Sequence, residues 1–211
     1  MDLMNNITCE RCMHLGGYRF DRRYAPEEFL EGKRSSKVWI VGLNPAWDIG
    51  ENHDSTRDDL ENYFVLGQRF HRYFEDFRHV SEQIYDGFGR EGGTAHTDIV
   101  KCGSKRFPGG RNGAELVHHC ADYLKRQIIQ YRPQLILCNG SPVSRYIQQE
   151  FLRNEDSGNT LTSYWTTVEG KDMCVVLTGF IGRIDNYSRR RLGVEIEARL
   201  AESNKRVGTA R

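Results

Sequence analysis

The chain has 211 residues, of which 38% are hydrophobic and 28% charged, and its formal net charge is +1. A chain of this length and composition can fill one hydrophobic core, and its near-zero charge excludes nucleic-acid binding through overall charge alone. It contains no apolar run of about 18 residues, and residues 1–12 lack the basic-then-apolar pattern of a secretion signal. We therefore expect one cytoplasmic domain over residues 1–211 that does not cross a membrane.

The first predicted strand is the apolar run VWIV at residues 38–41, which is too short for a helix and ends in turn-forming residues. It follows residues 1–36, a polar segment that we expect to wrap around the domain. Asn44 comes just after this strand, beyond its carboxyl end, where open α/β sheets bind their ligands. An ordinary turn, in which Asn44 only shapes the chain before Pro45, is the alternative.

The rest of the chain alternates between predicted strands and helices. Residues 50–62 form a predicted loop or lid, and the spacing of aromatic residues predicts a helix from about residue 65 to 77. Further strands are predicted at 97–102, 133–140, 163–168 (an edge strand) and 173–178, and further helices at 112–131, 141–152 and 189–203, before a frayed tail at 204–211. This order predicts an α/β fold, a three-layer α/β/α sandwich with a central, mostly parallel four-stranded sheet.

Two short segments are locally basic although the whole chain is not. Residues 101–111 contain four basic residues and no acid, and residues 183–191 contain four basic residues and one acid. Such patches could bind phosphates, and solvated surface charges are the alternative.

Six cysteines in a cytosolic chain favour metal or redox chemistry over disulfides. Cys9 and Cys12 form a CxxC pair, and Cys102 and Cys120 follow with 17 residues between them. Four thiolates from these positions could surround one iron–sulfur cluster or a zinc ion. Scattered buried cysteines are the alternative, and we expect this role for Cys138 and Cys174, which lie inside predicted strands.

Four motifs together resemble the uracil-DNA glycosylase superfamily, most closely its iron–sulfur branch (families four and five). They are GLNPA at 42–46, TDIVKC at 97–102, the cysteine set 9, 12, 102 and 120, and the run Cys120, Leu124, Gln127, Ile128, Pro133, Ile136 and Gly140. The GLNP form of the first motif is similar to that of the mismatch-specific branch. The resemblance covers about residues 9–200.

The resemblance implies an α/β/α enzyme that flips a base out of DNA and hydrolyses its N-glycosidic bond. We expect the protein to be a monomer. It implies a [4Fe-4S] cluster on Cys9, Cys12, Cys102 and Cys120, with zinc as the alternative. It assigns Asn44 to positioning the attacking water, with Asp48 as a second candidate. Phe64, or its neighbour Tyr63, would stack on the flipped base, and Gly42 would lie against it.

Asp98 departs from the motif of the family, which has an asparagine at this position for reading the base. An asparagine amide both donates and accepts hydrogen bonds, whereas an ionised aspartate only accepts. It would therefore repel O4 of uracil and accept from the exocyclic amine of cytosine. The alternative is that Asp98 only caps local backbone.

The histidine-containing motif near the C-terminal end of the family is also missing, because no histidine follows His119. Arg183 could supply positive charge in its place, and Ile184, Phe180 or Ile181 could wedge into the base stack. We expect the basic residues of the two patches to contact phosphates: Lys105, Arg106, Arg189, Arg190 and Arg191.

The resulting expectation is a glycosylase for a modified cytosine, such as glucosylated hydroxymethylcytosine in phage DNA. Unmodified cytosine is excluded as a target because its removal would destroy the cell's own genome. Glycines at 87–93 and 179–182 would leave room for a bulky base. Two alternatives are a repair glycosylase for uracil or another deaminated base, and a non-catalytic iron–sulfur protein that binds DNA or senses redox state.

Overall fold

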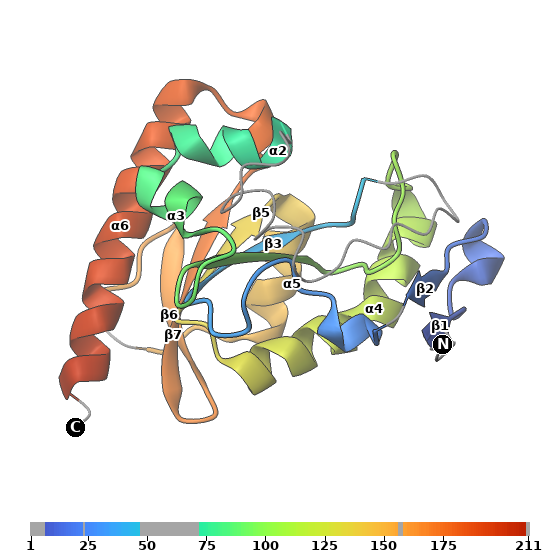
Figure 1. Ribbon diagram of the computed structural model, residues 1–211, viewed down its shortest axis with the longest axis horizontal. Helices are drawn as coiled ribbons and strands as arrows, with labels where there is room; N and C mark the ends of the chain where they lie inside the picture. The colour runs from blue at the N-terminus through green and yellow to red at the C-terminus, as the bar shows by residue number, and fades with distance from the viewer. Residues whose placement is uncertain (1–6, 23, 47–71, 156–157, 210–211) are drawn as a thin grey trace, which may run out of the picture.

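The structure is a computed structural model that describes residues 7–22, 24–46, 72–155 and 158–209. Its centre is a five-stranded sheet in the order β4-β3-β5-β7-β6 (Figure 1). The strands are β3 (Val38–Gly42), β4 (Thr94–Asp98), β5 (Leu135–Asn139), β6 (Ser163–Val168) and β7 (Lys171–Thr178). The first three and β7 are parallel, and β6 pairs antiparallel with β7 at the edge. The predicted fold class is confirmed, and the edge strand raises the sheet from four strands to five.

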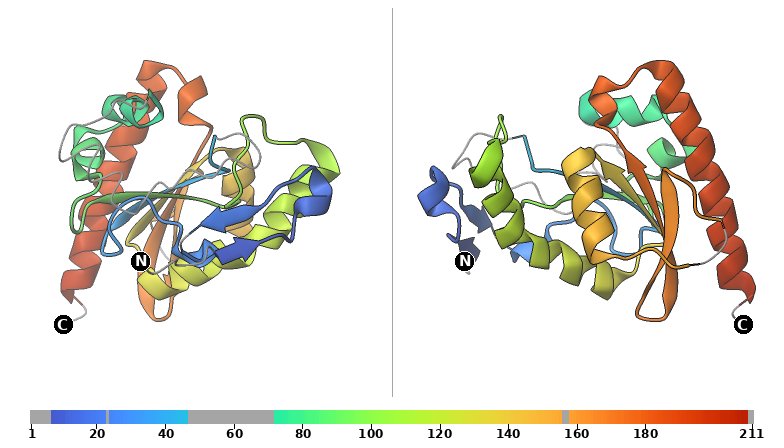
Figure 2. Two further views of the ribbon diagram at one scale, coloured as in Figure 1. Left: turned by 45° about the vertical axis from the view of Figure 1, so that its right-hand side comes forward. Right: turned by 180° about the vertical axis from the view of Figure 1, so that it is seen from behind.

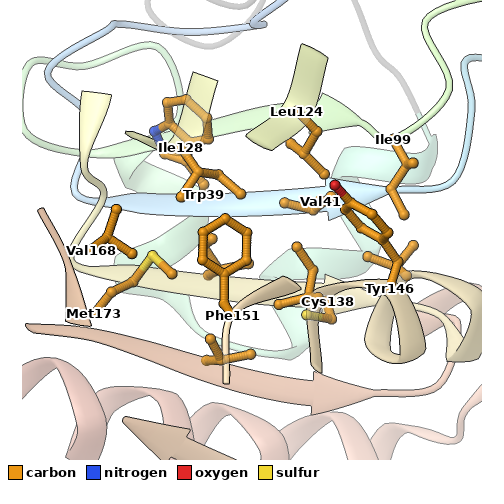
Figure 3. Close-up of a cluster of buried hydrophobic side chains, with 14 of the residues drawn as sticks. Trp39, Val41, Ile99, Leu124, Ile128, Cys138, Tyr146, Phe151, Val168 and Met173 are labelled. Carbon is orange, nitrogen blue, oxygen red and sulfur yellow. The ribbon is translucent and has the colours of Figure 1, made fainter. Parts of the chain in front are cut away.

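The sheet is covered on one face by α4 (Gly110–Tyr131) and α5 (Ser141–Glu150). Trp39 and Val41 of β3 point to this face and pack against Leu124 and Ile128 of α4 (Figure 3). Because alternate residues of a strand point to opposite faces, Ile40 faces the other layer.

The second face carries α2 (Arg72–Glu75), a 3-10 turn (Asp76–His79), α3 (Glu82–Gly87) and α6 (Asn186–Thr209), as Figure 2 shows. Ile40 and Val176 of the sheet pack there against Phe77 and Ile196. Every one of these four side chains is fully buried, so the sandwich has two separate cores.

The N-terminal segment adds a small antiparallel pair, β1 (Ile7–Cys9) and β2 (Phe20–Arg22), beside α4. Two 3-10 turns, Met13–Leu15 and Pro26–Glu28, complete it. A third core holds it in place, in which Phe20 and Phe29 pack with Val100 and Leu116. The predicted wrap is thus anchored by its own buried aromatic residues.

Several predicted boundaries differ from the structure. The strand predicted at 97–102 is β4, which ends at Asp98; beyond it, Val100 N–H donates to the carbonyl of Leu43, outside the sheet. The C-terminal helix begins at Asn186 and continues to Thr209, so residues 204–209 are not a frayed tail. The described part of the predicted 65–77 helix is broken into a short helix and a 3-10 turn.

The glycines at 87–93 do not form a roomy pocket. A Cβ on Gly93 would collide with the carbonyl oxygen of Gly87, so these two residues allow a close backbone crossing. They lie next to Thr94, at the amino end of β4, whereas Asp98 lies at its carboxyl end. In the described part of the chain, no helix is long and apolar enough to span a membrane.

Candidate active site

Polar residues gather where the parallel strands β3, β4 and β5 end. Gly42 ends β3, Asp98 ends β4 and Asn139 ends β5, and Gly42 and Asp98 are register partners. His96 lies two residues before Asp98, so both side chains leave β4 on the same face. This edge is where an open α/β sheet binds its ligands.

Gly42 makes room for this group of side chains. A Cβ at this position would collide with Oδ1 of Asp98 and lie 3.0 Å from Nε2 of His96. The two polar side chains therefore occupy the space that any other residue at position 42 would fill. Glycine is required here for its missing side chain.

Asp98 has a buried carboxyl group, with the residue 3% exposed. Among the described residues, none donates a hydrogen bond to this carboxyl, and Nε2 of His96 lies 3.8 Å from Oδ1. Burial raises the pKa of Asp98 to about 6, against the opposing effect of His96. Both oxygens of this carboxyl can therefore still accept hydrogen bonds from a ligand.

His96 is held from both sides of its ring. Nδ1 lies 2.6 Å from Oε2 of Glu31, and Nε2 lies 3.0 Å from the hydroxyl of Tyr73. Burial lowers the pKa of His96, but the charges of Asp98 and Glu31 outweigh burial, so that the pKa is raised overall. The site therefore favours a protonated imidazole.

Tyr73 and Asn139 extend this network toward the loop after β7. Asn139 Nδ2 donates to the Tyr73 hydroxyl at 2.8 Å, and Asn139 Oδ1 accepts from the Ile181 backbone N–H at 2.8 Å. The polar groups of the site are thus linked from the segment before β3 to the segment after β7.

Asn44 has a fixed side-chain orientation. Its Nδ2 lies 2.8 Å from the carbonyl of Pro45, 2.9 Å from the carbonyl of Ser104 and 3.1 Å from the Ser104 hydroxyl. The predicted turn is therefore present, and the same contacts direct Oδ1 away from them. In the part of the chain that is described, this oxygen has no hydrogen-bond donor, so it is available to a water molecule.

Lys101 differs from its predicted place in a surface patch. Its ammonium group is buried and donates to Thr97 Oγ1, the Asp98 carbonyl and Gln127 Oε1, at 2.9, 2.6 and 2.7 Å. Burial lowers the pKa of Lys101 to about 7. The Lys101 side chain thus stabilises the end of β4 by hydrogen bonds and does not reach solvent.

The model of the uracil DNA glycosylase superfamily matches residues 29–184, which include all five strands of the central sheet. The chain belongs to the uracil DNA glycosylase superfamily. Members of this superfamily are DNA glycosylases, hydrolases that act on damaged or modified bases. No curated protein matches the chain.

The superfamily match begins after Cys9 and Cys12, but the fold brings these residues to the other two predicted ligands. Cys12, Cys102 and Cys120 are buried in the third core and Cys9 packs against it. Cys120 lies within hydrogen-bonding reach of both Cys12 and Cys102, and all six cysteines are free thiols. The Cys9 thiol lies 3.6 Å from the Tyr123 hydroxyl and the Cys12 thiol 3.3 Å from Nδ1 of His119. Within the described residues, no group of three or more His, Cys, Asp or Glu is arranged to hold a metal as it stands. Cys138 and Cys174 are core residues of the sheet, as predicted.

The predicted DNA-binding residues in and after the loop that follows β7 differ in their exposure to solvent. Arg183 and Arg190 are exposed, and Ile184 is half-buried. Arg189 is buried instead: its guanidinium donates to the carbonyl of Ile181 at 2.9 Å and pairs with Asp76 at 3.1 Å. Because these contacts occupy the guanidinium, Arg189 anchors the loop to α6 and we remove it from the phosphate contacts.

The remaining predicted residues fall into two groups. Lys105, Arg106 and Arg191 are exposed, which is compatible with phosphate contacts, and Phe180 is 44% exposed while Ile181 is buried. Phe180 is thus the accessible aromatic residue of this loop. Asp48, Tyr63 and Phe64 lie outside the described residues.

Asn44 and Asp98 are predicted from the sequence as site residues, whereas His96, Glu31, Tyr73 and Asn139 are not. The spacing of His96 and Asp98 on one strand was a usable signal, because residues two apart share a face. Glu31 had no such signal. Its place depends on an isolated backbone pairing with His96, which brings together residues 65 positions apart.

Proposed function

We propose that the protein is a monofunctional DNA glycosylase that flips a modified cytosine out of DNA and hydrolyses its N-glycosidic bond, leaving an abasic site. The observation that carries this proposal is the buried carboxyl of Asp98, which lacks a donor among the described residues and lies at the carboxyl end of the sheet. The motif that the sequence resembles has an asparagine there.

The hydrogen-bonding edge of cytosine complements Asp98 when the carboxyl of Asp98 and N3 of the base share one proton. The exocyclic amine donates to one carboxyl oxygen, and the other oxygen shares a proton with N3 of the base. Because the pKa of Asp98 is raised to about 6, transfer of this proton costs little near neutral pH.

The same proton improves the leaving group. It moves from Asp98 to N3, the C1′–N1 bond breaks with its electron pair going to the base, and the base leaves as a neutral molecule. Oδ1 of Asn44 accepts a hydrogen bond from the water that attacks C1′, and the extra proton of that water passes to solvent. The oxocarbenium-like sugar needs charge stabilisation more than an activated nucleophile, so a neutral asparagine is sufficient.

We propose a [4Fe-4S] cluster on Cys9, Cys12, Cys102 and Cys120, with zinc as the alternative. The chemistry of the donors supports this proposal, because four free thiols from three segments lie in or against one core, although their present arrangement does not form a metal site. When bound, the group would tie the N-terminal segment to α4 and to the chain beyond β4.

We further propose that the base is a modified cytosine of foreign DNA, such as glucosylated hydroxymethylcytosine in phage DNA. Excision of plain cytosine would damage the host genome, so the modification must be required. The exposed basic residues near the carboxyl ends of β4 and β7 would contact the phosphates: Lys105, Arg106, Arg183 and Arg190.

A panel of oligonucleotides and phage DNAs tests this function. It contains glucosylated hydroxymethylcytosine, hydroxymethylcytosine, cytosine, uracil and hypoxanthine, in single and double strands. Mass spectrometry identifies the released base, and alkaline cleavage detects the abasic site. We expect release of a modified cytosine and none of plain cytosine. Binding without release of any base would contradict the proposal and favour a non-catalytic DNA-binding protein.

Asp98→Asn is the first variant to measure. An amide cannot transfer a proton to N3, so we expect the release of modified cytosine to fall about 100-fold, within the range of general acid catalysis. The release of uracil, with which an asparagine can form hydrogen bonds, should increase relative to the release of modified cytosine. Asp122→Asn, at an exposed carboxylate of α4, is the matched control. An unchanged base preference would remove Asp98 from base reading.

Uracil is the second candidate substrate. A protonated Asp98 presents a hydroxyl and a carbonyl, as an asparagine presents an amino group and a carbonyl, and its raised pKa makes this form accessible. Efficient uracil release by the unaltered protein would favour a repair enzyme.

A further inference from the structure

His96 lies beside the carboxyl that the proposed function needs. It is not part of the C-terminal histidine motif, which this chain lacks, and the proposed function gives it no role. Its Nε2 lies 3.8 Å from Oδ1 of Asp98, and both groups fill the space over Gly42. Both residues are at least 95% buried. The distance is short enough for each charge to act strongly on the other in this setting.

The contact with Glu31 determines which nitrogen of His96 carries a proton. A carboxylate accepts, so Nδ1 must donate to Oε2 of Glu31 in either charge state. Nε2 is then the nitrogen that gains or loses a proton. When Nε2 is unprotonated it accepts from the Tyr73 hydroxyl, and when it is protonated it becomes a donor.

We propose that His96 is a positioning residue that, together with Glu31, keeps one proton available to Asp98 for transfer to the departing base. This inference rests on the proposed function. In the resting pair the proton is on either Nε2 of His96 or the carboxyl of Asp98. After Asp98 gives it to N3, the carboxylate takes the next proton from solvent by way of His96.

The charges around the pair favour a single proton. Glu31 favours protonation of both members, whereas Lys101 opposes it from the other side. Tyr73 contributes no charge, because burial raises the pKa of its hydroxyl well above the usual value. Two buried groups so close to each other titrate as a pair, and activity should follow the protonation of the pair.

Glu31→Gln tests the proposal with little change in shape. The amide oxygen of glutamine still accepts from Nδ1, but the negative charge that raises the pKa of His96 is lost. We therefore expect the alkaline limb of the kcat/KM profile to move down by about one pH unit. Activity on that limb should fall about tenfold, and activity on the acid side should stay unchanged. Glu155→Gln, at an exposed glutamate, is the control.

A titration of the His96 ring by NMR makes the test independent of turnover. Removal of the carboxylate in Asp98→Asn should lower the pKa of His96, because Asp98 raises it in the unaltered protein. An active enzyme whose alkaline limb is unmoved in Glu31→Gln would overturn the role of His96 and leave the proposed function standing. An unmoved His96 pKa in Asp98→Asn would overturn the pairing whether or not the protein releases a base. Absence of base release from the unaltered protein, with the titrations as expected, would overturn the proposed function and the transfer of the proton to a base, and only the pairing of His96 with Asp98 would stand.

Discussion

Burial allows Asp98 to act as a proton donor near neutral pH. An exposed aspartate stays ionised at neutral pH and can only accept hydrogen bonds, whereas burial raises the pKa of this one to about 6. The neighbouring His96 opposes that rise, so the two residues together keep the carboxyl close to its titration range. Neither the type of residue nor its place in the sequence specifies this behaviour.

Gly42→Ala tests whether the site depends on the space over β3. The added Cβ would collide with Oδ1 of Asp98, and the carboxyl would have to move. A displacement of about 1 Å at a reacting group can cost about 100-fold in rate, so we expect a loss of this size in kcat/KM for base release. Gly109→Ala, where a Cβ meets nothing within 4 Å, should keep full activity. Full activity of both variants would show that Asp98 does not act from its observed position.

The sequence predicted the residues with local signals and missed those brought in by the fold. Asn44 and Asp98 follow recognisable strands, and the structure places both at strand ends. Glu31 and Tyr73 approach from other segments through pairing and packing that no local pattern encodes. Arg189 was predicted to contact phosphate but is buried, because a run of basic residues does not reveal which of its members is buried.

At the scale of elements, the strands with continuous apolar runs were the easiest to predict. All residues of β3 and β5 are buried, as expected for central parallel strands. The end of β4 was harder, because Ile99 and Val100 are as fully buried as strand residues, while the Ile99 N–H donates to the last carbonyl of β3, that of Gly42, and the Val100 N–H to that of Leu43 beyond it. A buried apolar residue is therefore not by itself evidence of a strand.

Gly193→Ala tests the contact between α6 and the turn before α3. Alanine in an open helix would gain about 1 kcal/mol over glycine. Here the Cβ would collide with the carbonyl oxygen of Val80, so the steric cost should outweigh this gain. We expect a net loss of about 1–3 kcal/mol in the free energy of unfolding, measured by denaturant titration. Val194→Ala, at an exposed position of the same helix, should change stability little. A stabilised Gly193→Ala protein would show that α6 does not approach Val80 this closely.

At the scale of the whole molecule, the cysteine group and the base-reading site share one segment of chain. Cys102 lies four residues after Asp98, and the intervening Lys101 donates to the carbonyl of Asp98. The N-terminal pair β1 and β2 reaches this segment through the third core, and Figure 1 shows it beside α4, away from α6. Loss of the proposed cluster should therefore loosen the end of β4 as well as the N-terminal segment.

Iron content and stability test the cluster together. Protein purified without oxygen should contain about four irons per chain and absorb visible light. Cys102→Ser should lose this iron and unfold at a lower temperature, because the N-terminal segment would lose one of its attachments. Cys174→Ala, at a buried cysteine of the sheet outside the group, should keep its iron, although its packing loss would also lower the unfolding temperature. Iron content, not stability, therefore separates the two variants. A colourless protein loaded with zinc would replace the cluster by the alternative metal, and a metal-free protein of unchanged stability would leave the four cysteines as core residues.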